Sequence, residues 1–217
     1  MSPQQMAYRD GLQAGVVTPA DVVRFKTPAS EHLALVSAAR DPRPSDASPP
    51  DPKLVQAVSA GDATAVKALL ASGVQVNARD AWGNSALLLA ARNGDVTSVR
   101  TLLKACARVE GGGAAMSPLA AAALRGHVLV VRLLIRHGAN VNAVGENDLT
   151  PLMNAVKLNR LEVAQELLQA GANPRTRDRN GDNVLAVAVS DNAAEMLALL
   201  LKYGVNPDMA DTNGLTA

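Results

Sequence analysis

The sequence predicts an all-α solenoid preceded by a short helical N-terminal extension. Apolar pairs recur along the chain, and their first members, Leu69, Leu102, Leu134, Leu167 and Leu200, are separated by 33, 32, 33 and 33 residues. A constant period of this length is typical of stacked repeats, in which each unit buries its face against its neighbours. Hydrophobic residues make up 48% of the chain and aromatic residues only 2%. The core is therefore expected to consist of Ala, Leu and Val, which suits closely packed helices.

Composition excludes several classes of protein. Lys and Arg number 21 against 20 Asp and Glu, so the formal charge is +1. This balance and the few aromatic rings argue against nucleic-acid binding, and no apolar run reaches the roughly 18 residues of a membrane span. The single cysteine, Cys106, cannot form an internal disulfide. We expect a soluble, cytoplasmic protein, with a periplasmic or secreted location as the alternative. The Lys-poor, Ala- and Arg-rich composition resembles proteins of GC-rich bacterial genomes.

The first part of the chain is expected to form short helices and a linker. Ser2, Thr18 and Thr27 each precede a proline, and proline is favoured at the first position of a helix behind a hydroxyl cap. Residues 1–41 are therefore expected to form two or three short helices. Five of the 12 prolines follow between Pro42 and Pro52, so residues 42–51 are expected to be an extended linker.

Each repeated unit is expected to contain two helices and a projecting loop. In residues 144–176, Thr150 and Pro151 supply a cap and a first helical residue. Asn159 is expected to end this helix in the left-handed region, a position that glycine occupies in other units. A second helix is predicted over 161–169, and Gly171 follows it.

The units resemble ankyrin repeats over residues 52–217. The segment Arg125–Ala143 matches the family's second helix with its outgoing arm. The family's Thr-Pro-Leu helix start is matched by Ser117–Leu119 and Thr150–Leu152, and its turn by Asp80–Gly83 and Arg179–Gly181. The units are 52–78, 79–110, 111–143, 144–176, 177–209 and a partial sixth, 210–217. The resemblance implies that the loops project as hairpin-like fingers.

Three regions depart from the family's pattern. The first unit carries Lys53, Gln56 and Ser59 where other units are apolar, which suits a polar cap. Cys106 replaces a helix-ending glycine and is expected to be a buried or half-buried apolar filler. The glycines at 111–113 should make the next finger the loosest, and they lack the Lys-Ser/Thr of a phosphate loop.

The C-terminal unit is expected to be incompletely covered. Val187, Leu197 and Leu201 lie in the fifth unit, and the chain stops at Ala217 near the start of the sixth. A fragment of a longer protein, or self-association through this end, would explain the arrangement.

No catalytic, metal or cofactor site is predicted. His127 follows Gly126 and is expected to form hydrogen bonds at the turn between helices, whereas His137 suits the C-terminal end of a helix dipole. Asp80, Asp178 and Asp211 recur at one repeat position, so turn formation accounts for them. The remaining histidine, His32, lies outside the repeats. The arginines at 175, 177 and 179 could meet an acidic partner, although a solvated surface is the commoner explanation.

The resemblance implies protein binding on a concave face made by the finger tips and the exposed side of each first helix. The positions carried over are Trp82, Asn84, Arg92, Asn93, Met116, Leu124, Arg125, Asn147, Leu149, Met153, Lys157, Arg179, Asn180 and Asp182. Trp82 stands out, because Trp is enriched among interface hot spots. The alternative is that its ring packs flat on the neighbouring finger.

The sequence therefore predicts a non-catalytic scaffold that binds another protein. Two alternatives stay open. The chain could be the regulatory or substrate-docking part of a larger enzyme, or it could bind a small apolar ligand in a pocket lined by Phe25, Leu33 and Val36.

Overall fold

A computed structural model of the chain describes residues 52–110, 116–190 and 193–207. All described residues belong to one unit of the chain, Ser48–Ala217. The predicted N-terminal helices, the linker, the glycine loop, Asp211 and the partial sixth repeat lie outside the described residues.

The described residues form helix pairs, which confirms the predicted all-α class. One pair falls in each of the five full repeat units, and a short 3-10 helix, η2 (Glu146–Asp148), precedes the fourth pair. The first helices are α3 (Pro52–Ser59), α5 (Ala86–Asn93), α7 (Pro118–Arg125), α9 (Pro151–Lys157) and α11 (Val184–Ser190). The second helices are α4 (Ala63–Ala71), α6 (Val96–Lys104), α8 (Val128–Arg136), α10 (Leu161–Gln169) and α12 (Ala194–Lys202).

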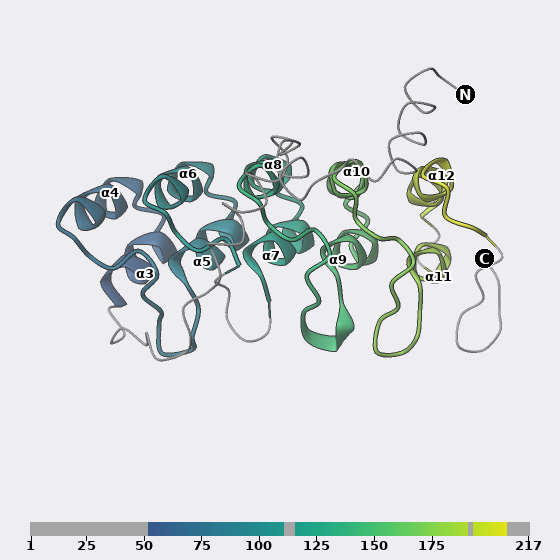
Figure 1. Cartoon of the computed structure of the whole chain (residues 1–217), viewed down its shortest axis with the longest axis horizontal. Coiled ribbons are helices and arrows are strands. Elements are labelled where there is room, and N and C mark those ends of the chain that lie inside the picture. The colour runs from purple at the N-terminus through teal and green to yellow at the C-terminus, as the bar shows by residue number, and fades with distance from the viewer. Residues whose placement is uncertain (1–51, 111–115, 191–192, 208–217) are drawn as a thin grey trace, which may run out of the picture. The chain divides into compact units, whose positions relative to one another are not determined.

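The helices lie in two layers (Figure 1). The first helices pack side by side in chain order, and the second helices form a parallel row beside them. Each first helix also packs against the second helix of its own unit. This nearest-neighbour packing is the arrangement that the constant period predicts.

Local sequence determines where the helices begin. The hydroxyl oxygens of Ser85, Ser117 and Thr150 accept hydrogen bonds from backbone N–H groups three residues later. The N–H groups at a helix start have no partner within the helix, so these caps stabilise the first turn. Asp62 and Asp95 do the same for α4 and α6.

Left-handed residues end the helices as predicted. Gly94 and Gly126 follow α5 and α7 with φ of 74° and 81°, and Asn159 has φ of 49°. Cys106 also adopts the left-handed region, with φ of 61°.

The expectation that Cys106 is buried is wrong, because its side chain is exposed. Its position corresponds to Gly73, Gly138 and Gly171 in other units. A Cβ atom built on these glycines meets no heavy atom within 4 Å. A side chain at this place in the repeat therefore points into solvent.

The core follows the leucine period. Leu102, Leu134, Leu167 and Leu200 are fully buried, whereas Leu69 near the first end is half-buried. Most of the remaining core is Val and Ala from the same helices. The polar residues Lys53, Gln56 and Ser59 of the first unit are exposed, as a capping unit requires.

Candidate functional site

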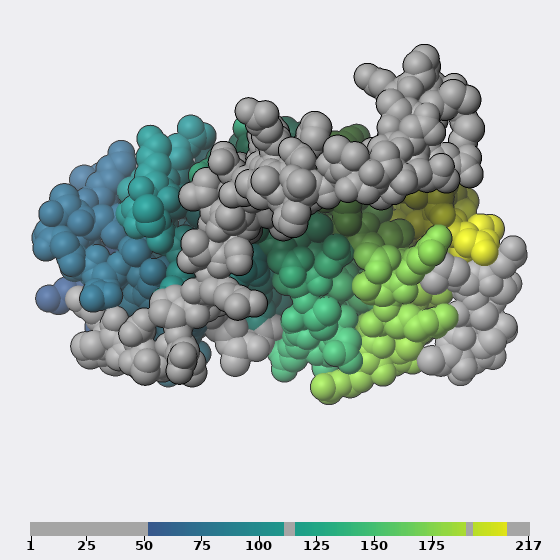
Figure 2. All heavy atoms as spheres, viewed as in Figure 1, coloured from purple at the N-terminus to yellow at the C-terminus, as the bar shows by residue number. Residues whose placement is uncertain are grey.

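Loops between successive units project past the layer of first helices (Figure 1). We call residues 72–85, 137–150 and 170–183 the second, fourth and fifth fingers, after the units that they lead into. Figure 2 shows the fourth and fifth fingers next to each other on one face of the molecule. The finger face comprises these fingers and the adjoining exposed residues of α5, α7 and α9.

An aspartate organises the turn in two of the fingers. The Asp80 carboxylate accepts hydrogen bonds from the backbone N–H groups of Trp82 and Asn84, at 2.9 and 2.8 Å. Asp178 accepts equivalent bonds from Asn180 and Asp182, at 2.9 and 3.1 Å. Turn formation by these two carboxylates is thus confirmed.

The hydrogen bonds also stabilise the ionised form of Asp80. Burial opposes ionisation, but the bonds from Asn84 and Trp82 outweigh it and hold the pKa of Asp80 below its ordinary value of 3.8. Because the pKa of Asp80 is lower in the folded protein than in the unfolded chain, its ionised carboxylate stabilises the fold at pH values above the unfolded pKa. This contribution is lost as the pH falls through the folded pKa.

We therefore expect acid to weaken the second finger. The contribution of Asp80 to the free energy of unfolding should be constant above about pH 5 and should decrease below about pH 4. When thermal unfolding is measured from pH 6 to pH 2, the unfolding temperature should fall less in Asp80→Asn than in the parent. Parallel curves for the two proteins would contradict the role of this carboxylate.

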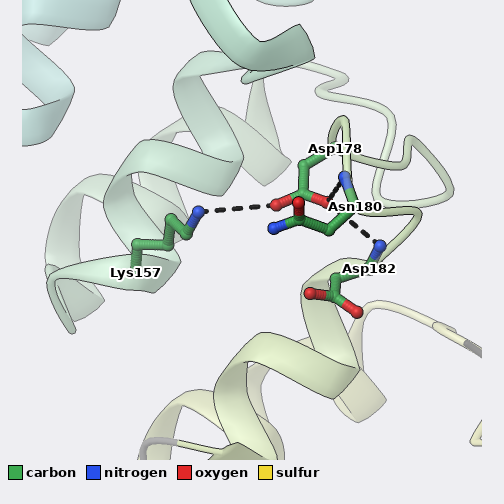
Figure 3. A network of polar contacts seen from close by, with 4 residues as sticks. All are labelled: Lys157, Asp178, Asn180 and Asp182. Carbon is green, nitrogen blue, oxygen red and sulfur yellow. Dashed lines mark hydrogen bonds and ion pairs between the residues drawn. The ribbon is translucent and has the colours of Figure 1, made fainter.

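Lys157 joins the fourth unit to the fifth finger (Figure 3). Its Nζ atom lies 3.4 Å from Oδ2 of Asp178, whose carboxylate also receives the backbone bonds of Asn180 and Asp182. Asp178 is buried, and Lys157 reaches it from the end of α9. Lys157, Asn180 and Asp182 were each predicted as binding residues, and the structure brings them together around this carboxylate.

The fourth finger has a different turn. Asn147 and Asp148 both adopt the left-handed region, with φ of 57° and 59°. Asn and Asp tolerate this region better than other residues with a Cβ atom, but at some cost. The carbonyl of Asn147 accepts a hydrogen bond from the backbone N–H of Arg179 at 3.0 Å, which joins the fourth finger to the fifth.

Most of the predicted binding positions are accessible. Trp82, Arg92, Asn93, Arg125, Asn147, Lys157, Arg179 and Asn180 are exposed. Asn84, Met116, Leu124, Leu149 and Asp182 are half-buried.

Met153 is the exception, because it is only 1% exposed and belongs to the core. It lies in the first turn of α9, which packs between α7 and α11. Its side chain is therefore unavailable to a partner, and the expectation that it lies on the surface is wrong.

The Trp82 side chain is 83% exposed. The alternative, in which the ring packs flat on the neighbouring finger, involves residues 111–115, which lie outside the described residues. The turn uses the backbone N–H of Trp82 and not its ring.

Four predicted residues meet in one pocket. Met116, Leu124, Asn147 and Leu149 line a half-open cavity of about 170 Å³ together with Ala120, Gly145, Glu146 and Asn154. We call this cavity the Asn154 pocket. Sequence reasoning missed Asn154 itself, although a polar residue inside an otherwise apolar helix, Pro-Leu-Met-Asn-Ala-Val, could have indicated it.

His127 connects the third unit to the second. Its Nε2 atom lies 3.1 Å from the carbonyl oxygen of Arg92, which confirms a hydrogen-bonding role at the turn. Nδ1 of His137 lies 2.8 Å from the carbonyl oxygen of Leu133, within the last turn of α8.

The arginines at 177 and 179 also make contacts within the fold. The guanidinium of Arg177 donates to the carbonyl of Gly181 at 2.6 Å, and Arg179 bonds to Asn147 through its backbone.

Across the described ranges, no group of three His, Cys, Asp or Glu side chains is placed to hold a metal ion. The described helices are also too short to cross a membrane.

Comparison with known proteins agrees with this architecture. Two family models, both describing ankyrin repeats, match the chain at residues 54–144, 107–178 and 167–217. Protein fem-1 homolog A-like from Mus musculus is 44% identical over 68 residues, which is 31% of this chain and 10% of that protein. Protein fem-1 homolog A from Homo sapiens is 38% identical over 82 residues, or 38% of this chain and 12% of that protein.

The matched segments thus span only about a tenth of the length of these relatives. The relatives are mammalian and give no support to the expected bacterial origin. The family models, in contrast, cover nearly all of the repeat region, and the helix pairs, caps and fingers agree with them. The chain belongs to the ankyrin repeat family.

Proposed function

We propose that this chain is a non-catalytic scaffold that binds a protein partner across the finger face. The observation that carries the proposal is the exposed ring of Trp82 on the second finger. The fold does not need this ring, since the turn uses only its backbone. Large aromatic side chains supply much of the binding energy at protein interfaces.

Bonds between successive fingers support the proposal, because they hold the face in one arrangement. The side-chain oxygen of Asn77 accepts from the backbone N–H of Arg108 at 2.8 Å. Asn142 accepts in the same way from Asn173 at 2.7 Å. A face that is ordered before binding loses less conformational entropy when the partner arrives.

A second candidate is the regulatory or docking part of a larger enzyme. The relatives' much greater length leaves room for it, since the matched segments are only 10% and 12% of their chains. The same finger face would then recruit the substrate or regulator. The small-ligand alternative depends on Phe25, Leu33 and Val36, which lie outside the described residues. The single cysteine supports a cytoplasmic location.

Substitution of Trp82 tests the proposal. A partner is first enriched on the immobilised parent from a lysate of the source organism and identified by mass spectrometry. Its affinity is then measured for the parent, for Trp82→Ala and for Leu129→Ala. We expect Trp82→Ala to weaken binding by about 30-fold, or about 2 kcal/mol, with unchanged thermal stability.

Leu129 is the matched control, because it is 60% exposed but lies on α8 in the layer of second helices. Its substitution should leave the affinity unchanged. Equal affinity of parent and Trp82→Ala, or an equal loss in both variants, would contradict binding at the finger face.

A further inference from the structure

We propose that the Asn154 pocket binds one aliphatic side chain of a partner peptide, while the Asn154 amide forms hydrogen bonds with the peptide backbone. A Lys or Arg next to the aliphatic residue is expected to complete the recognised motif. This inference rests on the proposed function, and it names the chemistry that one part of the finger face recognises.

The Asn154 side chain is buried without a hydrogen bond. It is 3% exposed, and within the described part of the chain its amide has no hydrogen-bonding partner. Asn183 is equally buried, but its oxygen accepts from the backbone N–H groups of Leu185 and Ala186 at 2.9 and 3.0 Å. The amide atoms of Asn154 are not among the enclosed side-chain atoms without a partner, which in the described part of the chain are Asp95 Oδ2 and Ser98 Oγ, so they are reached through the pocket. A ligand in the pocket can therefore form hydrogen bonds with this amide.

Size and lining select the ligand's side chain. The pocket encloses about 170 Å³, below the roughly 300–1,000 Å³ of ordinary small-molecule sites. Met116, Ala120, Leu124 and Leu149 supply apolar walls. A single Leu, Ile or Met side chain fits this volume and these walls.

The polar groups favour a peptide. An asparagine amide presents one acceptor oxygen and an NH₂ donor, so it can bond to both the N–H and the C=O of a peptide backbone. Four of the pocket residues also belong to the predicted partner-binding set. A peptide that crosses the finger face would therefore pass over the pocket.

Charge at the rim favours a basic neighbour. Glu146 lines the pocket, and Asp148 is exposed beside it. Among the described residues, neither carboxylate forms an ion pair. Glu146 is the charged residue among those that line the pocket, so the lining carries a net negative charge.

A displayed library of random twelve-residue peptides provides the probe. The full chain is immobilised and used for selection, and the enriched peptides are synthesised. Their affinities are measured for the parent, Asn154→Leu, Glu146→Gln and Trp82→Ala. Leucine has nearly the shape of asparagine, so Asn154→Leu removes the amide while keeping the pocket's outline.

We expect the enriched peptides to share an aliphatic residue beside Lys or Arg. Asn154→Leu should weaken them about tenfold, since it removes one or two hydrogen bonds, and Glu146→Gln should weaken them severalfold. Asn154→Leu should unfold at the same temperature as the parent or higher. The matched variant Asn183→Leu should unfold several degrees lower, because it loses two backbone partners.

Three results would overturn the inference. They are a failure to enrich any peptide, enriched peptides whose affinity is unchanged in Asn154→Leu, and a lower unfolding temperature for Asn154→Leu that matches the loss in Asn183→Leu. Peptides that depend on Trp82 but not on Asn154 would reject the pocket and leave the proposed function standing. A failure of the proposed function would instead show as partner binding that is insensitive to Trp82→Ala.

Discussion

Leu134→Ala is expected to lower the free energy of unfolding by about 2–5 kcal/mol. Leu134 lies on α8 and is fully buried. Because α8 packs between α6 and α10 in the layer of second helices, a cavity here affects two interfaces between units. Removal of the side chain loses its transfer free energy and leaves a space that neighbours fill only in part.

Chemical denaturation of the parent, Leu134→Ala and Leu129→Ala measures this effect. Leu129 lies on the same helix but is largely exposed, so its truncation should change the free energy of unfolding by no more than about 0.5 kcal/mol. If Leu134→Ala unfolded at the same denaturant concentration as the parent, the assignment of the leucine period to the stacked core would be wrong.

Gly94→Ala is expected to destabilise the junction between the second and third units by about 2–4 kcal/mol. Gly94 has φ of 74°, where any residue with a Cβ atom is strained. A Cβ atom here would also lie 2.6 Å from Nδ1 and Cε1 of His127. The ring cannot move away freely, because its Nε2 atom is engaged with the carbonyl of Arg92.

Gly61→Ala separates the two causes. Gly61 follows α3 with φ of 71°, but a Cβ atom there meets no heavy atom within 4 Å. It should therefore cost only the backbone strain, about 1–2 kcal/mol. Adding His127→Ala to Gly94→Ala should remove part of the stability loss by which Gly94→Ala exceeds Gly61→Ala. Equal losses in Gly61→Ala and Gly94→Ala would show that the His127 contact contributes nothing.

Features fixed by local chemistry were predictable from the sequence. The Thr150 cap, the left-handed Asn159 and the helix over 161–169 depend on a few neighbouring residues, and the structure shows all three. The leucine period indicated the core because each repeat meets the same neighbours.

Features that depend on the packing of a helix were not predictable in the same way. Met153 and Asn154 are adjacent on α9, and both are buried. Sequence position alone did not show that α7 and α11 enclose this turn, so Met153 was expected on the surface. The residue type of Cys106 predicts a core filler, but its place in the repeat directs the side chain outward.

The candidate site was predictable as a set of positions but not as geometry. The family resemblance supplied Met116, Leu124, Asn147 and Leu149, and the structure places them around one cavity. The cavity adjoins the fourth finger, whose turn differs from those of the second and fifth fingers. Two left-handed residues form this turn, and no regular repeat pattern indicates them.

Site-specific photo-crosslinking tests binding at the finger face most directly. A photoreactive amino acid is introduced at position 82, at position 124 or at position 129, and each protein is irradiated in lysate before mass spectrometry. We expect positions 82 and 124 to crosslink the same protein and position 129, on the layer of second helices, not to do so. Crosslinking of that protein from position 129 alone, or equally from all three positions, would contradict a partner bound across the finger face.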